Sequence, residues 1–200
     1  MIIYGSREAT LLRYGRGITS MLNTTDKNPN FYVDISKYYN HSVYENDECR
    51  GISCFFLTEK LQGLISCPEC EFKIFSSAQN DNIKCDGQKI FIAPLKIKKI
   101  AFLGYSEYGT VKDAFILHTA TSSIKEEFVF KTYQTNNFQG IDDSEINKKS
   151  IPVRCLRGSD GQLHNIYSWI VNISCMEEIT HIELPKNLSL HIMAITLITQ

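Results

Sequence analysis

The chain has 200 residues, a formal net charge of −1 at pH 7 and a hydrophobic content of 43%. A chain of this length buries roughly 70% of its unfolded surface, so it needs neither a metal nor a disulfide merely to fold. The 21 basic and 22 acidic residues are interspersed, which argues against the basic face of a nucleic-acid-binding protein. We expect a globular protein that binds no nucleic acid.

The sequence contains no sign of membrane insertion or export. No apolar run approaches the ~20 residues of a membrane helix, and the opening MIIYGSREATLLRYGRG is too polar for a signal peptide. The seven cysteines, an odd number, are typical of free thiols in a reducing compartment. We expect a cytoplasmic protein without membrane contact, or a secreted one if the chain is a trimmed form.

Residues 1–30 are predicted to form a short N-terminal arm, because Gly15 and Gly17 interrupt its only amphipathic stretch. From 31 to 200, short runs rich in β-branched and aromatic residues alternate with turn signals. This pattern is typical of an all-β sandwich or barrel. We expect about ten strands and no long helix. The strands are drawn from thirteen candidate segments: residues 31–35, 51–57, 61–67, 71–75, 83–85, 88–93, 97–105, 113–121, 126–135, 151–157, 164–174, 179–185 and 190–198.

Turn residues suggest how two of these segments are joined and where one stops. Asp86-Gly87 supplies the positive φ of a tight turn, which predicts a hairpin between 83–85 and 88–93. Pro94 is expected to end the second strand.

The chain finishes on LHIMAITLI, residues 190–198, after a predicted turn at Lys186-Asn187. This run is too short to cross a membrane. A short apolar run bounded by turn residues is typical of a strand buried on both faces. We therefore expect the last strand to lie in the middle of a sheet.

Several segments, in this order, resemble one family: VDISKYYN (33–40), EFKIF (71–75) with NDNIKCDGQKIFI (80–92), IKKIAFLGYSEYGTVKDAFILHTA (97–120), and IYSWIVNI (166–173) with ITHIELPKNLSLHIMAITL (179–197). Together, over residues 31–198, they resemble the carbohydrate-binding-like β-sandwich found alone or beside catalytic domains in bacterial glycoside hydrolases. The resemblance implies a single antiparallel, jelly-roll-like sandwich. It also implies non-catalytic binding of a glycan or glycoconjugate, and no catalytic residue comes with it.

The loops depart from that family. They differ after the YYN stretch, at CPEC (67–70) and at HTATSSIK (118–125). Loops at the ends of a sandwich carry its binding site. The alternative is therefore a protein-interaction or structural module that keeps only the scaffold.

Candidate ligand-binding residues are aromatic and acidic side chains in or beside loops. Sugars stack on exposed rings and form hydrogen bonds with planar polar groups. Tyr105 and Tyr108 flank a turn with Glu107 and are a candidate platform, although an aromatic residue in a sandwich is more often part of the core. The predicted binding set is Tyr38, Tyr39, Tyr105, Glu107 and Tyr108.

The cysteine spacing leaves two interpretations open. Cys49, Cys54, Cys67 and Cys70 have spacings that suit tetrahedral zinc, whereas a simple hairpin at CPEC makes them free thiols. Redox chemistry at CPEC is disfavoured, because no helix N-terminus follows to stabilise a thiolate. Cys155 and Cys175 are expected to be buried in strands.

No local motif for catalysis is present. The histidines His41, His118, His164, His181 and His191 show no metal-binding spacing, and surface or hydrogen-bonded core positions are expected for them. There is no nucleophile motif, no spaced pair of glycosidase carboxylates and no phosphate-binding glycine loop. We therefore expect a non-enzymatic protein without a cofactor, whose partner is a glycan or another protein.

Overall fold

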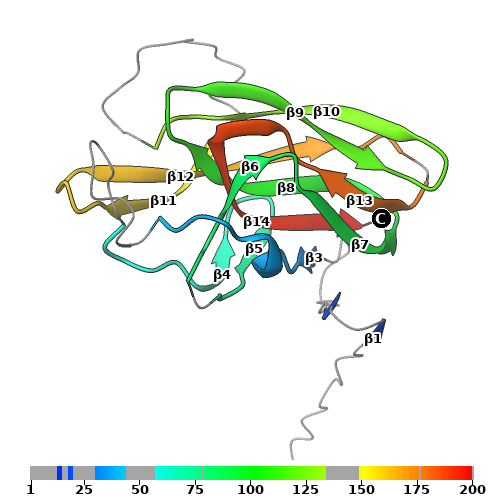
Figure 1. Cartoon of the computed structure of the whole chain (residues 1–200), viewed down its shortest axis with the longest axis horizontal. Helices are drawn as coiled ribbons and strands as arrows, with labels where there is room; N and C mark the ends of the chain where they lie inside the picture. Colours follow the sequence, from blue (N-terminus) through cyan, green and yellow to red (C-terminus); the bar gives the residue numbers. More distant parts are fainter. Residues whose placement is uncertain are drawn as a thin grey trace, which may run out of the picture.

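Two large antiparallel sheets stack face to face and form a β-sandwich (Figure 1). The computed structural model describes residues 13–14, 18–19, 30–43, 57–77, 79–133, 149–175 and 177–199. Most of the predicted N-terminal arm, residues 1–30, and most of the predicted strand 51–57 lie outside these residues. The all-β, antiparallel sandwich that the sequence predicts is confirmed.

The smaller of the two sheets has four strands. Their order is β10 (Ser123–Phe130), β9 (Val111–His118), β13 (Ile179–Glu183) and β7 (Lys89–Leu95). The larger sheet has six: β11 (Ile151–Arg157), β12 (Leu163–Asn172), β8 (Ile97–Ser106), β14 (Lys186–Thr199) and β3 (Asn30–Val33), with β6 (Ile83–Asp86) also paired to β14.

Shorter elements complete the described structure. The hairpin of β4 (Gly63–Ser66) and β5 (Glu71–Ile74) lies against the six-stranded sheet, and the 3-10 helix η1 (Ser36–Tyr38) follows β3. Near the N-terminus β1 (Arg13–Tyr14) pairs with β2 (Ile18–Thr19). Over the described ranges, no helix has the length and apolarity needed to span a bilayer.

The six-stranded sheet is buried on both faces. On one face the rings of Phe102, Phe115 and Phe128 meet between the two sheets, with centroids 4.8 to 5.5 Å apart. On the other face Met193 and its neighbours form a second core under the β4–β5 hairpin, whose Phe72 is fully buried. Figure 1 shows β9 and β10 on one side of β14 and β4 and β5 on the other.

β14 is therefore the strand that the terminal apolar run predicts. Residues 190–198 are all buried, and β14 lies between β8 on one side and β3 and β6 on the other. A strand with no solvent-facing side reads as a continuous apolar run rather than an alternating one. The expectation of a central last strand is confirmed.

A β-bulge interrupts β14 where it crosses β8. The register moves from Ile192 opposite Gly104 to Ala194 opposite Leu103, which leaves Met193 as the extra residue. The hydroxyl of Tyr39 donates to the Met193 carbonyl at 3.0 Å, so a main-chain acceptor at the bulge gains a hydrogen-bond donor.

Gly104 allows the close approach of β8 to β14 beside that bulge. A Cβ atom on Gly104 would lie 2.1 Å from the backbone oxygen of His191. Only glycine fits there without a shift of the main chain.

The predicted hairpin at Asp86-Gly87 is wrong in one respect. Gly87 does adopt φ 74°, as the turn signal predicts. However, β6 pairs with β14 in the larger sheet and β7 pairs with β13 in the smaller one. Because turn chemistry is local, it specifies the reversal of the chain but not the sheet that the next strand joins.

Two predicted strand ends also differ. Pro94 lies inside β7, where a missing N–H is tolerated because β7 is an edge strand. Lys186 and Asn187 do not form a separate turn but begin β14. The register of β14 against β6 shifts between Lys186 and His191, so this first part of the strand is irregular.

The bulge supports a prediction on stability. Tyr39→Phe removes the donor to the Met193 carbonyl in a buried site, and should lower the free energy of unfolding by about 1–3 kcal/mol. Tyr108→Phe removes the same hydroxyl from a side chain that is 73% exposed, and should change it by less than about 0.5 kcal/mol. Urea unfolding of both variants measures these changes. Equal losses in the free energy of unfolding would contradict a stabilising role of the Tyr39–Met193 hydrogen bond.

Candidate functional site

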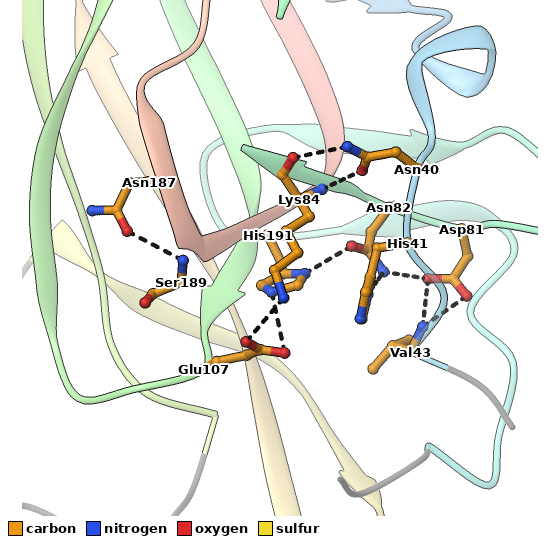
Figure 2. Close-up of polar contacts among 10 residues, drawn as sticks. All are labelled: Asn40, His41, Val43, Asp81, Asn82, Lys84, Glu107, Asn187, Ser189 and His191. Carbon is orange, nitrogen blue, oxygen red and sulfur yellow. Dashed lines mark hydrogen bonds and ion pairs between the residues drawn. The ribbon is translucent and has the colours of Figure 1, made fainter. Parts of the chain in front are cut away.

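A group of polar side chains lies at one end of the six-stranded sheet, where β8 ends and β6 pairs with β14 (Figure 2). Its members come from parts of the chain that are far apart in sequence. They are Asn40 and His41 after η1, Asp81 and Asn82 before β6, Lys84 in β6, Glu107 after β8, and His191 in β14. These seven residues are named the polar end below.

His191 is at the centre of the polar end and is 0% exposed. Its ring stacks on Tyr105 with centroids 4.7 Å apart, and His41 makes an edge contact at 4.6 Å. Nδ1 lies 2.9 Å from Oδ1 of Asn82, and Nε2 lies 3.4 Å from Oε1 of Glu107. An amide oxygen only accepts, so Nδ1 carries a proton. Burial lowers the pKa of His191, and the Glu107 carboxylate opposes that shift.

Asn82 connects the two histidines. Its Oδ1 accepts from His191, while Nδ2 donates to Asp81 Oδ1 at 2.8 Å and lies 3.3 Å from Nδ1 of His41. An amide nitrogen only donates, so Nδ1 of His41 is an acceptor without a proton. Burial, with smaller effects from His191 and Lys84, lowers the pKa of His41 to about 4. His41 is therefore neutral at pH 7.

Asp81 fixes the segment that carries His41. Asp81 is 6% exposed, and its carboxylate accepts a hydrogen bond from the Ser42 hydroxyl at 2.8 Å. The Val43 N–H donates to the same carboxylate, with nitrogen–oxygen distances of 3.1 and 3.2 Å. Backbone hydrogen bonds between His41 and Asn82 complete the connection. The buried part of the polar end is thus held by the segment before β6.

Lys84 and Glu107 form the outer part of the polar end. Their Nζ and Oε2 atoms lie 3.5 Å apart, with side-chain exposures of 32% and 22%. Asn40 holds the main chain of Lys84 through a reciprocal pair: Nδ2 donates to its carbonyl at 3.1 Å and Oδ1 accepts from its N–H at 2.7 Å. The site therefore presents a positioned ammonium and a positioned carboxylate to solvent.

The ionisation of Glu107 follows from its neighbours. Burial raises the pKa of this carboxyl, but contact with His191 and the charge of Lys84 outweigh burial and lower it below its ordinary value. Its backbone N–H donates to the Ser189 carbonyl at 2.8 Å, so the main chain is fixed too. Glu107 is an acceptor at neutral pH.

The structure brings some of the predicted binding residues together and separates others. Glu107 belongs to the polar end, and Tyr108 beside it is 73% exposed. Tyr105 is 1% exposed, and His191 covers a face of its ring. Tyr105 and Tyr108 do not form the expected platform, because strand β8 points Tyr105 into the second core.

Tyr38 and Tyr39 have structural contacts instead of a shared surface. Tyr39 is 8% exposed and donates to the Met193 carbonyl. The Tyr38 hydroxyl accepts from the Phe91 N–H at 3.1 Å and holds the edge of β7. Their roles in ligand binding stay predictions without support from this geometry.

Apart from the polar end, a row of three stacked rings crosses the outer face of the four-stranded sheet. His118 and His181 stack at 4.0 Å with an interplanar angle of 5°, and Phe91 stacks on His181 at 5.1 Å. His118 Nε2 lies 3.1 Å from Glu183 Oε2, which is 3.5 Å from Lys89 Nζ. The three rings come from neighbouring strands, with His181 of β13 between Phe91 of β7 and His118 of β9, so the row suits cross-strand stabilisation.

Sequence reasoning missed the residues that surround Glu107. His41 and His191 were expected at the surface or in the core without a shared role, and they are 150 residues apart. Asn82 and Lys84 carried no motif. The one signal was a histidine inside the apolar run LHIMAITLI, because a buried imidazole requires polar partners.

The structure tests only some of the predictions made for the cysteines. Cys49 and Cys54 lie outside the described residues, so the four-cysteine zinc site stays a prediction. Among the described residues, no three His, Cys, Asp or Glu side chains form a metal-binding group. Cys155 is exposed in β11, and the prediction that it is buried is wrong because its side chain points away from the core at a sheet edge.

The lowered pKa of His41 predicts a pH dependence. The unfolded chain binds a proton near pH 6.5, and the folded protein only near pH 4. The free energy of unfolding is therefore highest above pH 6.5, where His41 is neutral in both states. It should fall by about 2 kcal/mol as the pH falls towards 4, because protonation of His41 then favours the unfolded chain. Urea unfolding at pH 7, 5.5 and 4.5 should show a smaller loss for His41→Gln than for the wild type. Parallel pH profiles would contradict it.

Comparison with known proteins places the fold but not the activity. The model of the AziU2-like beta-sandwich domain family matches residues 34–200. No curated protein matches the chain. The matched region begins just after β3 and includes every residue of the polar end. The chain belongs to the AziU2-like β-sandwich domain family.

Proposed function

We propose that the polar end is a non-catalytic binding site for a glycan or glycoconjugate. The observation that carries the proposal is the Lys84–Glu107 pair, which is partly open to solvent and is held from behind by a buried network. Such a pair is positioned before a ligand arrives, so binding loses little side-chain entropy there.

The chemistry of the pair suits a polyhydroxylated ligand. A sugar hydroxyl both donates and accepts, and here an ionised acceptor and an ammonium donor lie 3.5 Å apart. The exposed ring of Tyr108, the residue after Glu107, offers an apolar face for the C–H groups of a sugar. One exposed ring and two charges predict weak, selective binding rather than tight binding.

Two further observations favour a glycan over a protein partner. The resemblance to carbohydrate-binding-like sandwiches covers residues 31–198, and the family match supports its sandwich part. Among the residues that the structure describes, the large exposed apolar side chains lie on different elements, whereas protein interfaces favour one continuous patch. They are Leu64 in β4, Phe91 in β7, Tyr108 after β8, Leu163 in β12 and Leu188 in β14.

A glycan array followed by titration of the hits tests this function. The reduced wild-type protein should give reproducible hits. Glu107→Gln and Tyr108→Ala should each weaken the hit at least about tenfold, because each removes a direct contact. Tyr108→Ala is the safer variant, since its side chain is exposed and its loss leaves the fold intact.

Glu183→Gln is the matched control. Glu183, like Glu107, contacts one histidine and one lysine. Its side chain is 28% exposed, against 22% for Glu107, but it lies on the outer face of the other sheet. Its substitution should leave binding unchanged. A blank array, or equal losses in the Glu107 and Glu183 variants, would overturn the proposal.

A further inference from the structure

The turn of the β4–β5 hairpin places two thiols in contact. Cys67 and Cys70 bracket Pro68-Glu69, and the Cys67 N–H donates to the Cys70 carbonyl at 2.9 Å. The two sulfur atoms lie 3.2 Å apart. A disulfide requires about 2.05 Å, so the sulfurs need to move together by only about 1 Å. The hairpin therefore holds a dithiol close to its oxidised geometry.

The two thiols differ in exposure. Cys67 is partly exposed, whereas Cys70 is 7% exposed and packs in the second core beside Phe72. A disulfide in solution can thus reach the sulfur of Cys67 before that of Cys70. Glu69 in the turn is paired with Lys99 of β8, with Nζ and Oε2 3.3 Å apart, which anchors the turn to the sheet.

The turn also separates the acidities of the two thiols. When Cys67 is ionised, the Cys70 thiol donates to its Sγ. This hydrogen bond, with backbone N–H groups of Glu69 and Cys70, lowers the pKa of Cys67 to about 6 against the effect of burial. The same contact and burial raise the pKa of Cys70. Backbone N–H groups of a tight turn thus supply what a helix N-terminus supplies in other thiol sites.

We propose that Cys67 and Cys70 form a thiol–disulfide exchange centre, with Cys67 as the attacking thiol, Cys70 as the resolving thiol and an accessible low-molecular-weight disulfide as the substrate. The sequence pattern disfavoured redox chemistry here because no helix follows. The geometry of the turn removes that objection.

The reaction balances in two steps. The Cys67 thiolate attacks one sulfur of the substrate, whose S–S bond breaks, and the released thiolate takes a proton from solvent. Cys70 then loses its proton and attacks Cys67 Sγ, which forms the Cys67–Cys70 disulfide and releases the second thiol after protonation. The substrate gains two electrons and two protons, and the dithiol loses them.

The first test measures thiol reactivity on the full reduced chain. Iodoacetamide labelling, followed by mass spectrometry of each cysteine peptide, should modify Cys67 at least about tenfold faster than the exposed Cys155 at pH 7. Labelling of Cys67 no faster than Cys155 would overturn the proposal.

The second test separates the attacking from the resolving thiol. With glutathione disulfide, the wild type should lose two hydrogens in mass and yield a Cys67–Cys70 peptide. Cys70→Ala, which keeps an apolar side chain in the core, should instead accumulate glutathione on Cys67. Cys67→Ala should form neither product, and thermal unfolding shows that each variant is folded.

Two results would count against the exchange centre. One is the absence of a trapped glutathione adduct in folded Cys70→Ala. The other is one zinc ion per purified chain, measured by elemental analysis, that blocks labelling of Cys67 until a chelator removes it. The second result would assign both thiols to a metal site instead.

Discussion

The burial of residues 190–198 of β14 on both faces is the constraint on which the rest of the structure depends. One face closes the core between the two large sheets, and the other closes the core under the β4–β5 hairpin. Its main chain pairs with β8 along one side and with β6 and β3 along the other. Removing water from both faces of one strand concentrates the hydrophobic stabilisation there. Both hydrophobic cores therefore depend on the side chains of β14.

The polar end follows from the same strand. Because residues 190–198 of β14 have no exposed side, His191 is buried and must find polar partners. The segments after η1, before β6 and after β8 supply them. Burying polar groups is costly unless each is hydrogen-bonded. Asn82 meets this condition for Nδ1 of His191, and the Glu107 carboxylate lies 3.4 Å from its Nε2. Lys84 and Glu107 extend from this network toward solvent. A requirement of the core thus shapes a surface site.

The sequence predicts what is local or repetitive and misses what depends on distant partners. The central position of residues 190–198 was predictable because burial on both faces leaves a continuous apolar run. The burial of Tyr105 was not, since β8 is covered on both faces near its end and shows no alternation there. The crossing at Asp86-Gly87 was missed because a turn does not encode the partner of the next strand. The contact of Asn82 with His191 joins residues 109 positions apart, and no spacing rule could reveal it. The acidity of Cys67 depends on turn geometry that residue types alone do not specify.

A double-mutant cycle between Asn82 and His191 tests most directly whether β14 organises the polar end. Free energies of unfolding are measured by urea for the wild type, Asn82→Leu, His191→Phe and the double variant, since these substitutions keep volume and remove the hydrogen-bonding groups. The account predicts a coupling energy of at least about 1 kcal/mol, because each single variant leaves a buried polar partner unsatisfied. Strictly additive effects would show that the two residues act independently, and would contradict the account.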